Sequence, residues 1–254
     1  MIQPYYQDSA VRIFHGDCRD VLPQIETADH WIFDPPYSQW THEKQWIGAA
    51  LTSDGKPRVS TAHKELGFAP LSAELRAEIC VEAARRCRRW MLAFCDLESI
   101  FYWRQSVVTS GLDYVRCAIW DKVDSAPQFT GDRPAASAEA IICAHPKGAK
   151  RWNSGGKRNV YRHAVNGGTG AKPHPSTKPE PLMCELIADF TDPGDLILDP
   201  FMGSGTTLVA AKRLGRQAIG IELEEKYCAI AAQRLSQGAL DLFASDQVGE
   251  DRPA

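Results

Sequence analysis

The fold is decided by the stretch Leu196-Ile197-Leu198-Asp199-Pro200-Phe201-Met202-Gly203-Ser204-Gly205-Thr206-Thr207. Three aliphatic residues before an acid predict a buried strand, and the apolar spacing over residues 206–214 predicts a helix after the glycines. Gly203 and Gly205 allow the backbone to approach a ligand closely, and the helix offers free N–H groups at Thr206. This order predicts a nucleotide or nucleoside site at the edge of a parallel sheet.

The next predicted strand, residues 217–221, ends at Glu222. An acid in this position is suited to hydrogen-bond both hydroxyls of a ribose. No Gly-Lys-Ser/Thr triplet follows the glycines, and Leu208 stands where a dinucleotide-binding motif has its third glycine. A nucleoside without phosphates therefore fits the motif better, and S-adenosylmethionine is the common one.

A second motif, Asp34-Pro35-Pro36-Tyr37, follows the apolar run 31–33. Two prolines end the strand in a stiff, extended turn. The turn brings together a carboxylate, backbone carbonyls and an aromatic face, to which a planar base carrying an amino group can bind. Taken alone, the tetrapeptide is more typical of a structural loop, and only the nucleoside motif downstream favours a catalytic role.

The remaining apolar runs alternate with helical patterns. Strands are expected at residues 11–14, 90–94, 114–120 and 140–144, and helices at 71–86, 100–110, 182–190 and 225–235. This alternation predicts an α/β fold, a doubly wound and mostly parallel sheet covered on both faces. Asp17, Asp34, Asp199 and Glu222 then all lie at the carboxyl ends of strands, where such sheets bind ligands.

Length and composition predict one domain over residues 1–254, with a weakly ordered tail at 241–254. The sequence shows neither a signal peptide nor an apolar run of membrane-spanning length, so we expect a soluble, cytoplasmic protein without a membrane partner. Eight cysteines are scattered singly, without a C-x-x-C pair. They are expected to be buried, reduced thiols, and no metal site is predicted.

The formal net charge of −3 does not indicate a nucleic-acid partner, but its distribution does. Residues 146–178 contain eight basic side chains and no acidic one, together with Trp152 and Tyr161. A solvated basic loop is the simpler interpretation, whereas basic residues among aromatic ones also suit contact with DNA. Residues 38–70 and 146–175 are therefore candidate target-recognition loops. The candidate DNA contacts, to phosphates or guanine edges, are Arg151, Lys157, Arg158 and Arg162.

The two motifs together resemble those of the amino-methylating DNA methyltransferases. Asp199-Pro-Phe-Met-Gly-Ser-Gly-Thr-Thr is similar to their cofactor motif, and Asp34-Pro-Pro-Tyr is similar to their catalytic motif. The catalytic motif comes first, as in the circularly permuted β group, and Gly16-Asp17-Cys18 and Ser176-Thr177-Lys178-Pro179 also stand where that group has them. The resemblance covers roughly residues 11–235 and implies a Rossmann-like class I methyltransferase fold.

The resemblance also implies roles for single residues. S-adenosylmethionine would meet Asp17 and the backbone of Cys18 at its adenine, and Glu222 at its ribose. Ser176, Thr177 and Lys178 would hold its carboxylate. Its methionine and ribose would be lined by Asp199, Phe201, Gly203 and Gly205, and Thr206, at the helix N-terminus, is a further cofactor-binding residue.

The expected reaction is methyl transfer to an exocyclic amine of a base rotated out of double-stranded DNA. Asp34 and the carbonyl of Pro35 would accept hydrogen bonds from the amine, Pro36 would stiffen the turn, and Tyr37 would stack on the base. Within the family, Asp at the first motif position favours adenine N6, and cytosine N4 stays open. A restriction enzyme partner and a homodimer are both compatible with the sequence.

Other functions explain less of the sequence. RNA or protein-amide methylation commonly uses Asn in place of Asp34, and a nicotinamide-dependent Rossmann oxidoreductase would leave Asp34-Pro-Pro-Tyr without a role. A catalytically silent DNA-binding relative is disfavoured because both motifs are intact.

Overall fold

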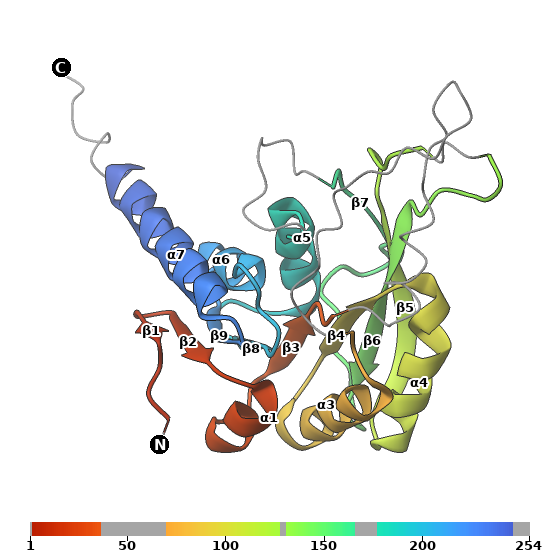
Figure 1. The fold of residues 1–254 in the computed structure, drawn as a ribbon, viewed down its shortest axis with the longest axis horizontal. Helices are drawn as coiled ribbons and strands as arrows, with labels where there is room; N and C mark the ends of the chain where they lie inside the picture. Colours follow the sequence, from red (N-terminus) through yellow and green to blue (C-terminus); the bar gives the residue numbers. More distant parts are fainter. Residues whose placement is uncertain (1, 37–69, 128–130, 166–176, 246–254) are drawn as a thin grey trace, which may run out of the picture.

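The computed structural model describes residues 2–36, 70–127, 131–165 and 177–245, and only the backbone of 238–245. In these residues the strands form a nine-stranded sheet in the order β1-β2-β9-β8-β3-β4-β6-β5-β7. Helices cover both faces of the sheet (Figure 1). The predicted α/β class, a doubly wound and mostly parallel sheet, is confirmed.

Seven of these strands, all except β1 and β7, coincide with predicted apolar runs to within two residues at either end. The strand bounds are β1 Tyr6–Gln7, β2 Val11–His15, β3 His30–Phe33, β4 Met91–Cys95, β5 Asp113–Asp121, β6 Ala138–His145, β7 Val160–Arg162, β8 Leu196–Asp199 and β9 Gln217–Glu222.

The central strands β2, β9, β8, β3 and β4 are parallel neighbours, so their carboxyl ends lie at one edge of the sheet. Strand β6 runs antiparallel between β4 and β5, and it therefore begins at the edge where β4 and β5 end. Strand β3, which leads into Asp34, precedes β8, which leads into the glycines. The chain order is thus the permuted order expected from the motifs.

Local chemistry accounts for two of the helix ends. The described helices are α1 Cys18–Val21, α3 Ala73–Arg86, α4 Ile100–Thr109, α5 Glu180–Phe190, α6 Thr206–Arg213 and α7 Glu225–Ser245, with short 3-10 turns at Leu22–Gln24 and Leu97–Ser99. The hydroxyl of Ser72 caps α3 by accepting the N–H of Leu75 at 3.1 Å. Gly215, with φ of 72°, follows the end of α6 in a conformation that other residues rarely adopt.

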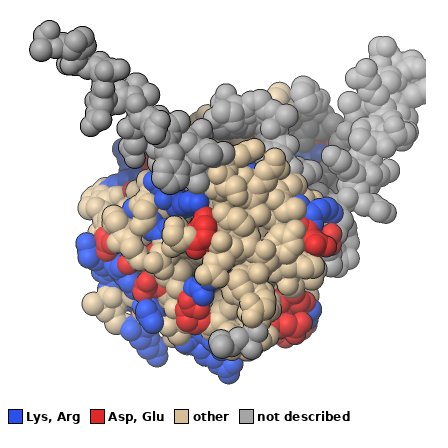
Figure 2. Space-filling model, turned by 90° about the vertical axis from the view of Figure 1, so that its left-hand side faces the viewer, with Lys and Arg blue, Asp and Glu red and all other residues tan. Residues whose placement is uncertain are grey.

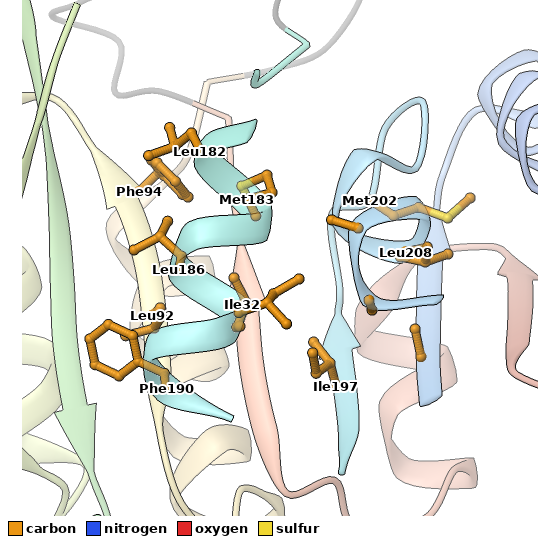
Figure 3. Close-up of a cluster of buried hydrophobic side chains, with 14 of the residues drawn as sticks. Ile32, Leu92, Phe94, Leu182, Met183, Leu186, Phe190, Ile197, Met202 and Leu208 are labelled. Atoms are coloured by element: carbon orange, nitrogen blue, oxygen red, sulfur yellow. The ribbon is translucent and has the colours of Figure 1, made fainter. Parts of the chain in front are cut away.

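Each face of the sheet carries its own core. The side chain of Ile32 points to the face covered by α5, α6 and α7, while Trp31 and Phe33 point to the face covered by α1, α3 and α4. Figure 3 shows Leu182, Leu186 and Phe190 of α5 facing β4, with Ile32 and Ile197 beside them. Burying each such side chain stabilises the fold by roughly 1.5–3 kcal/mol, so α5 is firmly fixed over the centre of the sheet.

Three elements differ from the sequence-based expectation. The short strand β1 was not predicted, and β7 lies inside the basic stretch that was predicted to be loop. Tyr161 explains β7, because its side chain is 1% exposed and belongs to the core under α5. Helix α7 continues to Ser245 rather than ending at 235, since residues 236–245 contain good helix formers and only one glycine. The remainder of the expected tail, 246–254, lies outside the described residues.

Six of the eight cysteines are buried, as expected, whereas Cys117 and Cys184 are partly exposed. Among the described residues, no helix has the length and apolar character needed to cross a membrane. Charged side chains of both signs alternate on the face shown in Figure 2, around a wide uncharged area. Among the described residues, that face therefore shows no continuous positive surface of the kind expected for DNA binding.

Candidate active site

The carboxyl ends of the parallel strands bring the predicted acids to one edge of the sheet. Along this edge, Asp17 follows β2, Glu222 ends β9, Asp199 ends β8 and Asp34 follows β3. Glu139, near the start of the antiparallel strand β6, lies at the same edge beyond β4. Residues far apart in the sequence are thus arranged in one row.

The glycine turn between β8 and α6 is bound to the next strand end. The N–H of Gly203 donates to Glu222 Oε2 at 3.0 Å, and the N–H of Glu224 donates to Glu222 Oε1 at 2.9 Å. Gly203 and Gly205 have φ of 52° and 79°. A Cβ added to Gly203 would meet nothing within 4 Å, so the turn has open space beside it for a ligand.

The other side of the turn is packed tightly. A Cβ on Gly205 would lie 2.8 Å from the Cβ of Ala231 on α7. Arg234 of α7 donates to the carbonyl of Ser204 at 2.6 Å and to the hydroxyl of Thr206 at 3.1 Å. Helix α7 therefore fixes the shape of the turn.

Burial governs the charge state of the two acids beside this turn. It raises the pKa of Asp199 to about 7, although Thr207 and the N–H of Phe201 donate to this carboxyl group and oppose the rise. Burial also raises the pKa of Glu222, opposed by the N–H groups of Glu224 and Gly203. Both carboxyl groups are thus held in a partly dehydrated environment.

At the far end of the row, Asp17 caps α1 and is bound by Arg19. Its carboxylate accepts the backbone N–H of Arg19 at 2.9 Å and the guanidinium Nη2 at 2.6 Å, which lowers the pKa of Asp17. Gly16 donates to the carbonyl of Glu222 at 2.9 Å, so this loop lies against the end of β9. Cys18 is buried beside it, and burial raises the pKa of its thiol to about 12.

Asp34 lies after β3 with one carboxylate oxygen paired and the other not. Oδ2 is 2.5 Å from the ammonium of Lys178. Oδ1 is buried and has no hydrogen-bond partner among the residues that the structure describes. Burial raises the pKa of Asp34 to about 6 against the opposing charge of Lys178, and the charge of Glu139 adds to the rise. Above that pH Asp34 is mostly ionised, and its buried Oδ1 can accept a hydrogen bond.

Lys178 lies between two carboxylates. Its ammonium is 3.2 Å from Glu139 Oε2 in addition to the contact with Asp34, and it lies 5.0 Å from the centre of the Phe94 ring. Burial lowers the pKa of Lys178, but the charges of Asp34 and Glu139 outweigh burial and raise the pKa above its ordinary value. Lys178 is therefore a buried cation beside the catalytic motif.

The two motifs make contact with each other. The rings of Phe33, before Asp34, and Phe201, in the glycine turn, lie 5.9 Å apart. The hydroxyls of Thr177 and Ser204 are 3.2 Å apart, which connects the segment carrying Lys178 to the glycine turn. A methyl donor bound at the turn and an amine bound at Asp34 would thus be neighbours.

The predicted DNA contacts lie in different surroundings. Lys157 is held by Asp189 at 2.5 Å and by Glu185 at 2.7 Å. Arg151 pairs with Asp192 and Arg162 with Asp121, each at 3.1 Å, but both guanidinium groups are well exposed, as is the Arg158 side chain. DNA contact by these four residues stays a prediction, and the geometry favours the three arginines over Lys157.

Several predicted residues lie outside the described part of the chain. These are Tyr37, Ser176, nearly all of the first candidate recognition loop (residues 38–69) and the last third of the second (residues 166–175). No group of three potential metal ligands occurs among the described residues.

Sequence reasoning missed three residues of the site. Glu139 was missed because acids were sought only at the ends of strands, whereas β6 is antiparallel and its first residues lie at this edge. An acid directly before an apolar run was the signal in the sequence that could have found it. Lys122 pairs with Glu139 at 2.6 Å. Arg234 lies on α7, where the helical pattern gave no indication of its contact with the glycine turn.

Comparisons with known proteins agree with this geometry. The family model N6_N4_Mtase, described as DNA methylase, matches residues 28–233. The Type II methyltransferase M2.LlaDCHI of Lactococcus lactis subsp. cremoris is 30% identical over 94% of this chain and 94% of its own length. The Type II methyltransferase M2.DpnII of Streptococcus pneumoniae is 30% identical over 92% of this chain and 93% of its own length.

Solved structures show the same similarity. The crystal structure of the M1.HpyAVI–SAM complex has a TM-score of 0.64 and 25% identity, covering 89% of this chain and 98% of that one. The cytosine-N4-specific PvuII DNA methyltransferase, at 16% identity and a TM-score of 0.69, shares the fold over 92% of this chain and 89% of its own. Since the family model spans most of the sequence, this chain belongs to the N6_N4_Mtase family of DNA methylases.

Proposed function

We propose that this protein transfers the methyl group of S-adenosylmethionine to N6 of adenine in double-stranded DNA. Membership of the family makes it a DNA methyltransferase that uses S-adenosylmethionine, and the crystal structure of the M1.HpyAVI–SAM complex is similar to this chain. The observation that carries the proposal is the Asp34 carboxylate, which has one oxygen paired with Lys178 and one buried oxygen available.

The residues present fit S-adenosylmethionine. The glycine turn has open space beside Gly203, and Glu222 already lies against that turn at the distance of a hydrogen bond. A carboxylate accepts more than one hydrogen bond per oxygen, so Glu222 can bind ribose hydroxyls without releasing the turn. Asp17 and Cys18 lie beside Glu222 for the adenine, and Asp199, Phe201, Gly205 and Thr206 form the remainder of the turn.

When bound, S-adenosylmethionine supplies an electrophilic methyl group. The protein has to orient the amine of the base and take up its proton. An exocyclic amine is a weak nucleophile because its lone pair is delocalised into the ring. Hydrogen bonds from the amine to Asp34 Oδ1 and to the Pro35 carbonyl would favour a more pyramidal nitrogen and direct it at the methyl group. After transfer the nitrogen is strongly acidic, and Asp34 lies in position to accept its proton.

The residues of the segment 176–178 are assigned two different roles, one toward the cofactor and one toward Asp34. Thr177 lies beside the glycine turn, with its hydroxyl 3.2 Å from that of Ser204, and is assigned to the cofactor carboxylate together with Ser176, which lies outside the described residues. Lys178 was also assigned to that carboxylate from the sequence, yet its ammonium is bound to Asp34 and Glu139. We therefore assign Lys178 chiefly to the charge balance of Asp34.

Adenine is preferred over cytosine because of the first residue of the catalytic motif. Within the family, Asp at this position favours adenine N6 and Ser favours cytosine N4. Cytosine N4 remains the second candidate, because the family model covers both bases and the PvuII enzyme shares the fold.

DNA recognition is assigned to the exposed arginines and the two candidate loops. Arg151, Arg158 and Arg162 would contact phosphates or guanine edges, and Tyr37 would stack on the base after it leaves the duplex. A homodimer, in which a second subunit would widen the DNA footprint, stays a prediction.

The test is transfer of labelled methyl from S-adenosylmethionine to unmethylated bacterial DNA, followed by hydrolysis and mass spectrometry of the nucleosides. We expect N6-methyladenine with the native protein and about a hundredfold less with Asp34→Ala, which should still bind the cofactor product in calorimetry. N4-methylcytosine would replace the adenine assignment. Absence of labelled DNA with a folded protein that binds the cofactor would refute the function.

A further inference from the structure

Four side chains of alternating charge form a row of ion pairs that leads from β5 and β6 to Asp34 of the catalytic motif. Lys122, directly after β5, pairs with Glu139 Oε1 at 2.6 Å; Glu139 Oε2 lies 3.2 Å from Lys178; and Lys178 is 2.5 Å from Asp34 Oδ2. We call these residues the charge network. Only Asp34 and Lys178 belong to the motifs from which the function was proposed.

The inner members of the charge network are buried. Glu139 and Lys178 are 7% and 9% exposed, so each needs an opposite charge to remain ionised at this position. Trp120 lies below both lysines, with its ring centre 5.1 Å from the Lys122 ammonium and 6.0 Å from that of Lys178. Aromatic faces and the two carboxylates thus define where the Lys178 ammonium can lie.

The position of Lys178 determines what Asp34 can do. A buried ammonium with a single carboxylate partner would bind that carboxylate as tightly as possible and weaken it as an acceptor. Here Glu139 draws the same ammonium from the other side. Asp34 therefore shares its counter-ion, and one of its oxygens stays available.

We propose that Glu139, held by Lys122, is a positioning residue for methyl transfer, which shares the Lys178 ammonium with Asp34 and keeps Asp34 Oδ1 available to the target amine. The inference rests on the proposed function for its kinetic consequence only. The arrangement of charges is a property of the protein without substrate, and it can be measured there.

The charged groups around Asp34 determine the sign of the expected effects. Glu139 raises the pKa of Asp34, whereas Lys178 and Lys122 lower it. Asp199 and Cys95 also lie near, and each is affected by the charge of Asp34. Removing the charge of Glu139 should therefore lower the pKa of Asp34, and removing that of Lys122 should raise it.

The first experiment is a carboxyl NMR titration of protein labelled with ¹³C-aspartate, with the Asp34 signal assigned through Asp34→Asn. We expect Glu139→Gln to move the Asp34 midpoint to lower pH and Lys122→Met to move it to higher pH. Glu82→Gln is the control, because Glu82 is a partly exposed carboxylate that pairs with Arg85 and Arg86 on α3. Unchanged midpoints in both network variants would overturn the inference, whether or not the protein methylates DNA.

The second experiment is single-turnover methyl transfer to unmethylated bacterial DNA across pH 5 to 9. Glu139→Gln should lower the rate constant about tenfold or more, leave the affinity for the cofactor product unchanged, and shift the acidic limb in the direction of the NMR midpoint. Glu139→Asp, which keeps the charge, should retain the native acidic limb. If native protein methylates DNA and Glu139→Gln does so at the native rate, the inference fails while the function stands.

Failure to fold does not remove the test. Thermal unfolding is measured for each variant, and Lys122→Met, which should raise the Asp34 midpoint, provides the charge-removing comparison if Glu139→Gln is unfolded. If the NMR midpoints move as expected but no DNA is labelled, the charge network is supported and the proposed function is refuted.

Discussion

Gly205→Ala is expected to destabilise the fold and weaken cofactor binding, through a contact that can be separated from backbone strain. Gly205 has φ of 79°, and a Cβ at this position would lie 2.8 Å from the Cβ of Ala231, which is fully buried on α7. The left-handed conformation costs an alanine about 1–2 kcal/mol. Overpacking against α7 adds roughly 1–3 kcal/mol, because neither backbone can move without disturbing the glycine turn.

Gly215→Ala is the matched control. Its φ of 72° imposes nearly the same strain, yet a Cβ there would meet nothing within 4 Å. We therefore expect a loss of about 1–2 kcal/mol for Gly215→Ala and about 2–5 kcal/mol for Gly205→Ala.

The assay is urea unfolding of the three proteins followed by circular dichroism, with calorimetric titration of S-adenosylhomocysteine. Only Gly205→Ala should lose affinity for this cofactor product, since its clash displaces the turn that binds it. Equal stabilities of the two variants, or equal affinities, would refute the argument that α7 fixes the shape of the cofactor site.

Three further outcomes are expected. The kcat/KM of methyl transfer should rise with pH through about 6 and then level off. The reason is that the pKa of Asp34 is raised to about 6, and its ionised form accepts a hydrogen bond from the amine. A kcat/KM that stays constant between pH 5 and 7 would contradict this. Glu222→Gln should weaken binding of S-adenosylhomocysteine in calorimetry more than it lowers the rate at saturating cofactor, and the reverse order would exclude a ribose contact. Lys157→Met should lower the free energy of unfolding by about 1–3 kcal/mol, because its partner Asp189 has a side chain that is only 8% exposed. Lys150 is the control: its side chain is as exposed as that of Lys157, but it pairs with the surface carboxylate of Asp113, so Lys150→Met should change the free energy of unfolding by under about 1 kcal/mol. Equal losses of the two variants in urea unfolding would contradict the structural role of Lys157.

Much of the architecture follows from the sequence, because short apolar runs have few alternatives to being buried strands. The glycine turn and the two prolines located the strand ends, and parallel strands necessarily bring those ends to one edge. Asp34, Asp199 and Glu222 were therefore placed in one row before any contact between them was known. The cap at Ser72 and the helix end at Gly215 follow from local chemistry in the same way.

What the sequence left open depends on contacts between distant residues. The direction of β6 could not be read from its apolar pattern, and for this reason Glu139 was missed. Lys178 and Asp34 are 144 positions apart, and only the folded chain shows that the ammonium lies at the catalytic carboxylate. Lys157 looked like a DNA contact because its two acidic partners lie on α5, outside the basic stretch.

In the proposed mechanism, Asp34 directs the amine of adenine at the methyl group. This role of Asp34 is tested most directly by mass spectrometry of nucleosides from unmethylated DNA incubated with S-adenosylmethionine and either native protein or Asp34→Ala. We expect N6-methyladenine with the native protein and about a hundredfold less with the variant, at unchanged affinity for S-adenosylhomocysteine. Equal amounts of methylated base from the two proteins would contradict this role.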